Sequence, residues 1–202
     1  MALRVIVFVD FWNLQLGWNR EAAGRRLDWL ALPNVLATEA ACFATAREQE
    51  SSAHEVTTII YASWNPTNET KLKGWLVRYL GKRPEFTIKL RERRFVQRKF
   101  RCSHCVKQFA NCPACGQSLL GTEEKGVDTA IATDLVALAA DGECDLAIQV
   151  SDDADHVPAV EWAVNRGVRV VNATWVASGS ALSQASSQST TLIELIPVLS
   201  RG

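Results

Sequence analysis

The sequence lacks any apolar run of the roughly 18–20 residues that a helix needs to cross a bilayer. Its N-terminal segment, MALRVIVFVDFWN, is apolar but lacks the small-residue cleavage site of a secretory signal peptide. Within that segment, residues 3–9 are apolar almost throughout, which is typical of a strand buried on both faces. We therefore expect a cytoplasmic protein that does not bind a membrane.

The sequence also lacks net charge, because its 22 basic residues balance its 22 acidic residues. The charges are spread unevenly, since residues 78–107 hold eleven basic side chains and only two acidic ones. Phe95, Phe100 and Phe109 lie among them, a combination that suits RNA or DNA. The alternative is a solvated strand and loop without a ligand. The candidate nucleic-acid-binding residues are Arg91, Arg93, Arg94, Arg98, Lys99, Arg101 and Lys125.

Internal repeats are absent as well, and 202 residues suit one domain, expected here over residues 1–200. The expected strands are 3–9, 55–61, 86–96, 145–151 and 168–172, and the expected helices are 32–50, 68–80, 126–140 and 157–166. Residues 178–191 and the apolar run LIELIPVL after them predict a short helix that leads to a last strand. This alternation predicts an α/β fold with a mostly parallel central sheet and helices on both faces.

Aspartates follow apolar stretches at distant points of the chain. Asp10 ends the first expected strand, Asp128 lies near the start of a helix, and Asp153 and Asp155 follow another strand. Ligands bind beyond the carboxyl ends of parallel strands, so we expect Asp10 and Asp153 to lie near each other. Carboxylates suit a hard cation such as Mg²⁺ or Mn²⁺, which assists phosphodiester hydrolysis. The alternative role of each aspartate is to cap a turn or a helix.

Three further polar residues accompany these aspartates. Asn13 is a candidate for binding a phosphate or orienting a water molecule, or it caps the following helix. Asp134, six positions after Asp128, borders the same cleft on a different face of its helix. Asp152 adds a third carboxylate to the segment with Asp153 and Asp155, and their mutual repulsion must be offset by a cation, a helix N-terminus or solvent.

Read together, these motifs resemble the NYN domain, a branch of the PIN-like nucleases that includes LabA-like proteins. The family pattern opens with a strand and Asp-Gly-x-Asn, continues with Lys-Gly-Val-Asp and a later Asp, and then has Ser-Gly-Asp-x-Asp-Phe before a Pro. The matching segments here are DFWN at 10–13, KGVD at 125–128, TD at 133–134, SDDADH at 151–156 and the proline at 158. The resemblance covers nearly the whole chain apart from a cysteine-rich insertion.

The resemblance implies a PIN-like three-layer sandwich and RNA cleavage that depends on Mg²⁺ or Mn²⁺. It carries over Asp10, Asp128, Asp153 and Asp155 as the metal-site acids. Two positions depart from the family pattern, where Phe11 and Asp152 each replace a glycine. We expect the bulky Phe11 to narrow the cleft, and the extra carboxylate of Asp152 to change metal affinity or repel RNA.

Four cysteines form two C-x₂-C pairs with six residues between the pairs. Thiolates at this spacing fit tetrahedral Zn²⁺, whereas two disulfides are the alternative. The expected ligands of this structural zinc are Cys102, Cys105, Cys112 and Cys115. We expect a small zinc-ribbon insertion at residues 100–118, while Cys42 and Cys144 are expected to be buried free thiols.

These expectations combine into a metal-dependent endoribonuclease with a structural zinc. The basic residues steer the RNA strand, and the aspartates hold the catalytic cation. The alternative is an RNA-binding or adaptor protein on the same fold with weak or absent catalysis. A phosphatase or Toprim-like enzyme using Asp153 and Asp155 is a third option, but it leaves the Lys-Gly-Val-Asp segment unexplained. The sequence leaves the oligomeric state open, a homo-oligomer included.

Overall fold

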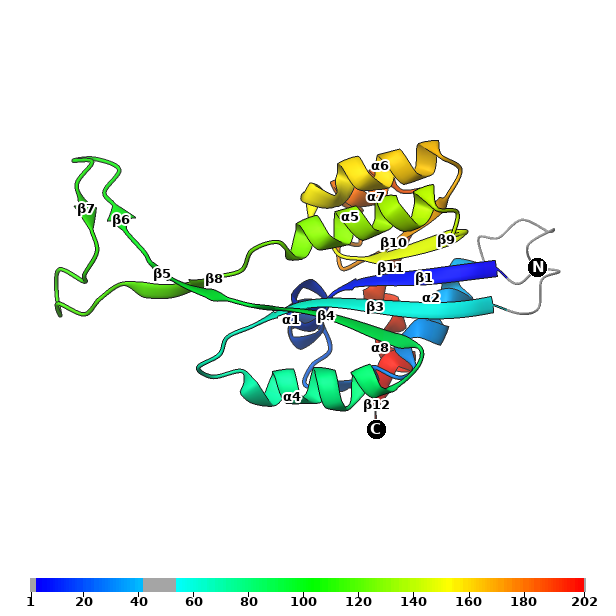
Figure 1. The fold of residues 1–202 in the computed structure, drawn as a ribbon, viewed down its shortest axis with the longest axis horizontal. Helices are drawn as coiled ribbons and strands as arrows, with labels where there is room; N and C mark the ends of the chain where they lie inside the picture. The colour runs from blue at the N-terminus through cyan, green and yellow to red at the C-terminus, as the bar shows by residue number, and fades with distance from the viewer. Residues whose placement is uncertain (1–2, 42–53, 202) are drawn as a thin grey trace.

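A computed structural model describes residues 3–41 and 54–201, which are built around a six-stranded sheet (Figure 1). Neighbouring strands are all parallel, and their order across the sheet is β11-β10-β9-β1-β3-β4. The strands are β1 (Leu3–Asp10), β3 (His54–Trp64), β4 (Phe86–Glu92), β9 (Leu146–Val150), β10 (Arg169–Thr174) and β11 (Gln188–Thr191). The predicted α/β fold with a parallel central sheet is confirmed.

The central strand β1 is apolar because both of its faces are buried. Val5, Val7 and Val9 contribute to one hydrophobic core, whereas Ile6 and Phe8 contribute to the other. Successive side chains of a strand point to opposite faces, so one apolar run fills two cores. The run in residues 3–9 therefore indicates a central strand covered on both sides.

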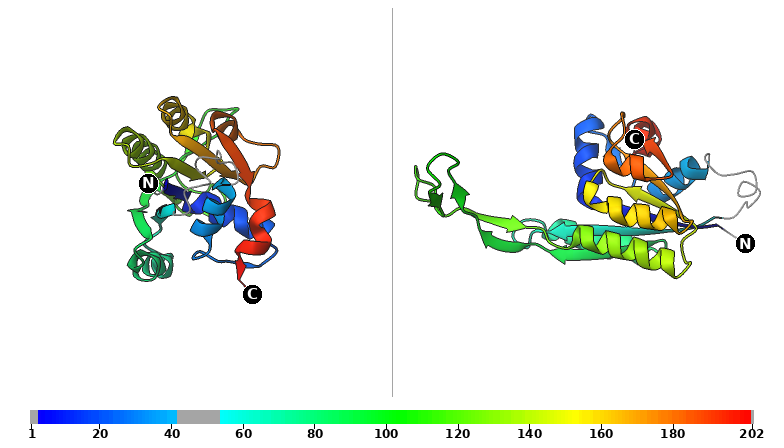
Figure 2. Two further views of the ribbon diagram at one scale, coloured as in Figure 1. Left: turned by 90° about the vertical axis from the view of Figure 1, so that its right-hand side faces the viewer. Right: turned by 90° about the horizontal axis from the view of Figure 1, so that it is seen from above.

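Helices cover both faces of the sheet and complete three layers (Figures 1 and 2). One face carries α1 (Phe11–Glu21), α2 (Leu32–Ala41), α4 (Thr70–Arg78) and α8 (Leu192–Leu199). The other face carries α5 (Val127–Ala140), α6 (Val157–Asn165) and α7 (Ala181–Ala185). This arrangement confirms the predicted three-layer sandwich. No helix in the described part of the chain is both long enough and apolar enough to span a bilayer.

The order of the strands creates a topological switch point beside β1. From β1 the chain moves outward through β3 to β4, and it then returns to β9 and moves the opposite way through β10 to β11. Connections therefore leave β1 and β9 in opposite directions at their carboxyl ends. Such a switch point is where parallel α/β sheets bind ligands.

A long β-ribbon projects from the sheet at the carboxyl end of β4 (Figures 1 and 2). It begins with β5 (Arg94–Gln97), which pairs with β8 (Leu120–Glu123), and continues to β6 (Phe100–Arg101), which pairs with β7 (Gln108–Phe109). We call residues 94–123 the arm. Because β4 is parallel to β1 through β3, the arm leaves from the same edge of the sheet at which β1 ends.

The tail contains the expected short helix and last strand, α7 and β11, but it continues into a further helix that the sequence did not predict. The last strand of the sheet is the polar β11, and the apolar run after it forms the helix α8, whose buried side chains pack on the sheet. A strand at the sheet edge needs few apolar residues, whereas the covering helix needs many.

The remaining expected elements lie close to their predicted bounds. The expected strand 86–96 is divided at Arg93 into β4 and β5, and the expected helix 32–50 is described as far as Ala41. Cys42 lies outside the described residues. The short elements are β2 (Arg26–Leu27), which pairs with β12 (Ser200–Arg201), and the 3₁₀ helices η1 (Leu80–Lys82) and η2 (Ala154–His156).

Candidate metal centre

Asp10 lies at the junction of β1 and α1, where it caps the helix. Its carboxylate accepts a hydrogen bond from the Asn13 backbone N–H at 3.1 Å, and the Ser151 hydroxyl lies 3.5 Å from its other oxygen. The residue is only 8% exposed. Burial raises the pKa of Asp10 above its usual range, and the charges of Asp128 and Asp153 add to this, although the Asn13 N–H opposes it.

Asp128 stands in the first turn of α5, and one of its carboxylate oxygens lies within 4.8 Å of a carboxylate oxygen of Asp10. The turn before the helix depends on Gly126, whose φ of 80° is readily adopted only by glycine. Partial burial raises the pKa of Asp128, and the neighbouring charges of Asp153 and Asp155 raise it further. The Lys-Gly-Val-Asp segment therefore delivers a carboxylate to the end of β1.

Asp153 and Asp155 lie in the turn that follows β9. Asp153 caps the 3₁₀ helix η2 by accepting a hydrogen bond from the Asp155 N–H at 2.9 Å. The Asp153 N–H in turn donates to the Ser151 hydroxyl at 3.1 Å. Helix capping therefore accounts for one oxygen of Asp153, and the turn holds both carboxylates next to Asp128.

The structure brings the four predicted acids together in two overlapping groups. One ligand atom from each of Asp10, Asp128 and His156 lies within 4.8 Å of the others, and the same is true of Asp128, Asp153 and Asp155. Asp128 belongs to both groups. We call Asp10, Asp128, Asp153 and Asp155 the carboxylate cluster.

The carboxylate cluster fits a hard divalent cation. Its ligand atoms are oxygens, the type that Mg²⁺ and Mn²⁺ prefer. The pKa of Asp10 and that of Asp128 are both raised, so their negative charges are poorly compensated by the protein around them. A cation would supply that missing compensation.

His156 is a member of the site that the sequence did not identify. Its side chain is 1% exposed, and neither ring nitrogen has a hydrogen-bond partner within the described structure. The available signal was its position, because it follows Asp155 where the family pattern has phenylalanine.

Glu124 is a second residue near the site that sequence reasoning missed. It accepts a hydrogen bond from the Ser63 hydroxyl and lies 3.8 Å from the Arg93 guanidinium. Partial desolvation raises the pKa of Glu124, and the charge of Asp10 raises it further. The sequence alone does not show that Glu124 lies near Asp10. The one available signal was its position directly before the Lys-Gly-Val-Asp segment.

Two predicted site residues have other contacts. Asn13 contributes its backbone N–H to Asp10 from the first turn of α1. Asp134 accepts hydrogen bonds from the Tyr61 hydroxyl and the Lys89 ammonium, each at 2.5 Å. It belongs to neither metal-ligand group found among the described residues. Six residues of helix separate it from Asp128, which is about 9 Å along the axis.

Both departures from the family pattern are absorbed by the fold. Phe11 is buried and stacks on Trp29, with ring centroids 5.3 Å apart, so it fills the core under α1. Asp152 accepts hydrogen bonds from the Thr174 hydroxyl and from the Trp175 N–H, the latter at 3.1 Å. Its carboxylate is thus tied to the end of β10.

The predicted basic residues fall into two kinds, and Arg93 represents the first. Its guanidinium donates to the Ser63 hydroxyl at 2.8 Å, lies 3.4 Å from Glu69, and packs over Trp12 at 4.8 Å. It is therefore held inside an ion-pair network. Arg98 is also occupied, since its side chain crosses Gly121 and donates to the Thr122 carbonyl at 3.3 Å.

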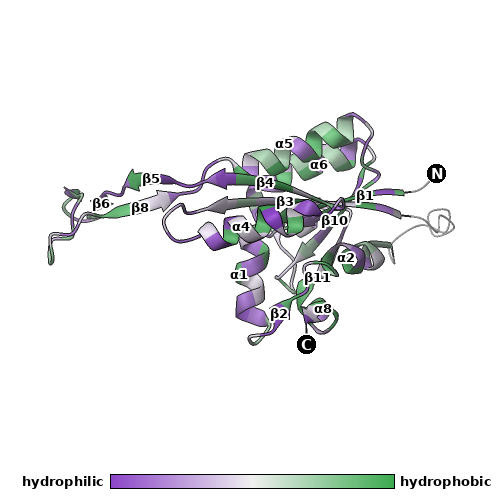
Figure 3. Cartoon of the chain, turned by 60° about the horizontal axis from the view of Figure 1, so that its bottom comes forward, coloured by the Kyte–Doolittle hydropathy of each residue, from purple (hydrophilic) through white to green (hydrophobic). Residues whose placement is uncertain are grey.

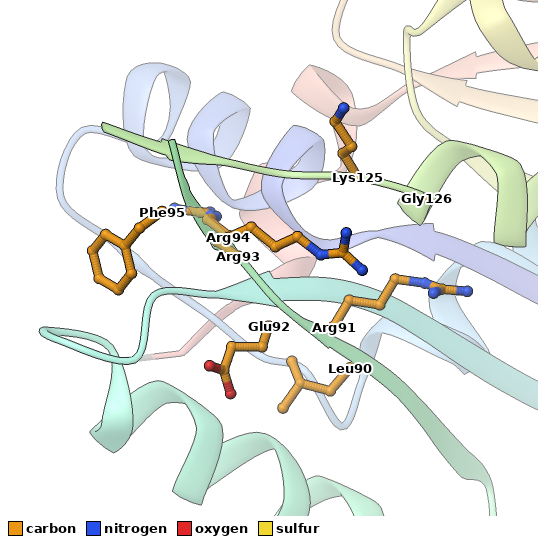
Figure 4. A pocket seen from close by; sticks show the side chains of 8 residues that line it. All are labelled: Leu90, Arg91, Glu92, Arg93, Arg94, Phe95, Lys125 and Gly126. Atoms are coloured by element: carbon orange, nitrogen blue, oxygen red, sulfur yellow. The ribbon is translucent and has the colours of Figure 1, made fainter. Parts of the chain in front are cut away.

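The second kind is exposed and lies along the root and length of the arm. A cleft of about 840 Å³ at the root is lined by Arg91, Arg94, Phe95 and Lys125, among others (Figure 4). In that view Glu92 points to the side opposite Lys125. Lys125 lies 3.3 Å from Glu123 but is still largely exposed.

Further out, Lys99 and Arg101 are exposed and lie beside solvent-facing aromatic rings. Phe95 is 58% exposed and Phe100 is 64% exposed, whereas Phe109 is half-buried. Hydrophilic and hydrophobic residues follow each other along the arm (Figure 3). The arm thus presents cations and aromatic faces together, as surfaces that bind single-stranded nucleic acid do.

The cysteine pairs form two similar turns near the tip of the arm. The Cys102 N–H donates to the Lys107 carbonyl at 3.0 Å, and the Cys112 N–H donates to the Gln117 carbonyl at 2.7 Å. Each turn contains a residue at positive φ, Val106 at 59° and Gly116 at 73°.

In each turn the pKa of the first thiol is lowered from its usual range. Backbone N–H groups of Cys105 and His104 lower the pKa of Cys102. Backbone N–H groups of Cys115 and Ala114 lower the pKa of Cys112 in the same way. The described residues do not gather three or more of these sulfurs into one ligand group. The structure therefore shows two cysteine pairs but not a zinc ribbon.

Comparisons with known proteins agree with this fold. A family model described as the NYN domain matches residues 4–194. The crystal structure of a Vibrio parahaemolyticus protein of unknown function is similar with a TM-score of 0.55, at 18% identity, over 95% of this chain and 93% of that chain. At this identity the similarity supports the fold alone. No curated protein matches the chain.

Proposed function

This chain belongs to the NYN domain family, and from that premise we propose that it is a metal-dependent endoribonuclease. NYN domains are generally nucleases, and this chain has the cluster of acidic residues that such chemistry requires. The proposed reaction is hydrolysis of RNA phosphodiester bonds at the carboxylate cluster. DNA is the alternative substrate.

The observation that carries this proposal is the convergence of Asp10, Asp128, Asp153 and Asp155. They come from three separate segments and meet at the switch point beside β1. The pKa values of Asp10 and Asp128 are raised, which means that their environment disfavours the charged carboxylates, unlike an ordinary protein surface. Residues whose pKa values are perturbed by desolvation and by neighbouring charges are candidates for a functional site.

The carboxylate cluster would hold Mg²⁺ or Mn²⁺. When bound, such a cation neutralises phosphate charge and lowers the pKa of a water molecule. Asp10 is fixed by the Asn13 N–H, and Asp153 is fixed by the Asp155 N–H, so both carboxylates are oriented before a cation arrives. Asp134 acts from outside the cluster by holding Tyr61 and Lys89.

The arm would guide RNA toward this site. Lys125 and Gly126 line the basic cleft at its root, and Asp128 follows Gly126 by two residues. The basic cleft and the carboxylate cluster therefore share neighbouring residues of the chain. Exposed Arg94, Lys99 and Arg101 would neutralise phosphates. Phe95 and Phe100 offer faces on which bases can stack.

We also propose a structural Zn²⁺ at the tip of the arm, held by the four cysteines of its two turns. The matched turns and the lowered pKa values of Cys102 and Cys112 support thiolate ligands there. A site with four protein ligands has no open position for substrate. This zinc would therefore stabilise the turns within a single NYN domain that spans residues 1–200.

The test is to incubate the protein with end-labelled single-stranded and structured RNAs and the matching DNAs. Each substrate is assayed with Mg²⁺, with Mn²⁺ or with a chelator. Cleavage should require a divalent cation and should be lost in Asp10→Asn and Asp153→Asn, while circular dichroism shows both variants folded. Cleavage that is unchanged in both variants would sink the mechanism.

A second candidate is an RNA-binding or adaptor protein without catalysis. The exposed cations and aromatic rings of the arm favour it, because they do not depend on the carboxylate cluster. Such a protein would bind RNA with a steep salt dependence but leave it intact even with Mn²⁺.

A further inference from the structure

His156 lies at the junction of η2 and α6, beside the carboxylate cluster. It ends η2 and directly precedes α6, so its backbone is fixed by two helices. One of its ring nitrogens lies within 4.8 Å of carboxylate oxygens of both Asp10 and Asp128. The residue is 1% exposed, so water has little access to its ring.

Both ring nitrogens of His156 lack a hydrogen-bond partner among the described residues. A buried polar group without a partner is costly and rare in folded proteins. A phenylalanine at this position would carry no buried polar atoms and would avoid that cost. The unpartnered imidazole therefore indicates a bound partner that is not part of the protein, such as a metal ion.

We propose that His156 is a nitrogen ligand for a divalent cation that it shares with Asp10 and Asp128, and that this imidazole makes the site select Mn²⁺ over Mg²⁺. The inference rests on the proposed function only for the presence of a cation at the carboxylate cluster. Mg²⁺ takes oxygen ligands and sheds water reluctantly, whereas first-row transition ions accept imidazole readily.

The two ligand groups differ in the way that this selection requires. Asp10, Asp128 and His156 offer two oxygens and one nitrogen, and they are mostly buried. Asp128, Asp153 and Asp155 offer oxygens alone and are more exposed. The nitrogen is thus present only on the buried side, where the protein rather than water supplies the ligands.

An imidazolium counter-ion is the competing explanation. A positive charge on His156 would neutralise part of the negative charge of Asp10 and Asp128 and would lower the pKa of both carboxyls. In that case the ring competes with the cation. Its removal would then strengthen the binding of Mg²⁺ and Mn²⁺ alike, which is the opposite of the loss that a ligand predicts.

The experiment measures the Kd of Mn²⁺ and of Mg²⁺ by calorimetric titration of the tag-free full chain and of His156→Phe. Phenylalanine is the residue of the family pattern and keeps an aromatic ring at this position. His104→Phe is the matched control, because His104 is exposed in the arm. We expect His156→Phe to weaken Mn²⁺ at least about tenfold and Mg²⁺ far less, and His104→Phe to change neither.

A second measurement keeps the test valid if His156→Phe fails to fold. Pulsed electron paramagnetic resonance of Mn²⁺ bound to the wild-type chain should show coupling to an imidazole nitrogen. Wild-type Mn²⁺ without nitrogen coupling, an unchanged ratio of the two Kd values in His156→Phe, or tighter binding of both ions would overturn the proposal. None of these readouts needs cleavage, so a protein that binds Mn²⁺ through His156 but cuts nothing refutes only the nuclease.

Discussion

The carboxylate cluster and the arm carry opposite charges and are built in opposite ways. The cluster gathers side chains from three distant segments at the ends of β1 and β9 and the start of α5. The arm is one continuous stretch, residues 94–123, with its basic side chains largely in solvent. The comparison shows that the acids depend on the whole fold, whereas the cations depend on a local ribbon.

This difference determines how each region should respond to substitution. The acids are fixed by helix caps and by partial burial, so each has one defined task. The exposed cations of the arm share one task and can partly replace one another. Single changes should therefore have large effects in the cluster, and only combined changes should have large effects in the arm.

The largest effect on cleavage is expected for Asp128, and Asp134 on the same helix is its matched control. Asp128→Asn removes the ligand common to both groups and should lower single-turnover RNA cleavage by about a thousandfold, since a cation supplies several kcal/mol to such reactions. Asp134→Asn removes the negative charge that pairs with Lys89 and accepts a hydrogen bond from Tyr61, and it should cost about 1 kcal/mol of stability. Its cleavage rate should stay within tenfold of wild type. Equal losses of cleavage would break the comparison.

An intermediate effect is expected from the arm. Changing Arg94, Lys99 and Arg101 together to Gln should weaken RNA binding at least tenfold and should reduce the slope of log K against log salt by about 2. Binding is measured by fluorescence anisotropy at several salt concentrations. The rate of cleavage at saturating protein should change little.

The matched control for the arm removes the same charge from the body of the protein. Arg20, Arg25 and Arg166 are also exposed and are changed together to Gln. This variant should keep the wild-type slope. If both triple variants lose binding equally, the arm has no special role and only net charge matters.

A smaller effect is expected at the tip of the arm. Cys102→Ser combined with Cys105→Ser should remove zinc, which metal analysis should find at one ion per wild-type chain. Because the tip lies far from the sheet (Figure 1), the main thermal transition should hardly move, and RNA affinity should fall only a few-fold. Cys144→Ala is the control and should retain zinc. A wild-type chain without stoichiometric zinc contradicts the assignment.

The smallest effect concerns the stability of the cation-free protein. Burial raises the pKa of Asp10, so the folded state holds this proton more tightly than the unfolded chain does. Stability from that carboxyl is present below its ordinary pKa of about 4 and is lost as pH rises toward the folded pKa. Without Mg²⁺ or Mn²⁺, Asp10→Asn should melt a few degrees higher than wild type at pH 7.

Calorimetry over a range of pH checks this sign. The advantage of Asp10→Asn should shrink as the pH falls toward about 4 and should disappear when Mn²⁺ saturates the wild-type protein. An Asp10→Asn variant that melts below wild type at pH 7 would show that the cluster is not destabilised by its own charge.

The sequence was informative where a local pattern decides the structure. The apolar run at residues 3–9 predicted a strand buried on both faces. The rule for carboxyl ends of parallel strands placed Asp10 and Asp153 at the same end of the sheet, where each shares a ligand group with Asp128. The tail was less predictable, because an edge strand such as β11 needs no apolar residues and its covering helix α8 does. An apolar run therefore predicts that a segment is buried more reliably than it predicts whether the segment is a strand or a helix.

Contacts between distant residues lay beyond sequence reasoning. Nothing in the chain's order shows that Asp152 bonds to Thr174 and Trp175, or that Arg93 is enclosed by Glu69 and Ser63. The burial of His156 is hidden for the same reason, since a histidine after two acids in a turn suggests an exposed cap. Such facts depend on which strand ends meet, and only the folded structure contains them.

The most direct test of the account is a crystal of the full chain soaked in Mn²⁺ and measured for anomalous scattering. The account predicts a strong anomalous peak bounded by Asp10, Asp128 and His156 or by Asp128, Asp153 and Asp155, and its absence in Asp128→Asn crystals. A map with no peak at the ends of β1 and β9, while Mn²⁺ appears elsewhere on the molecule, would contradict the claim that the carboxylate cluster is a metal centre.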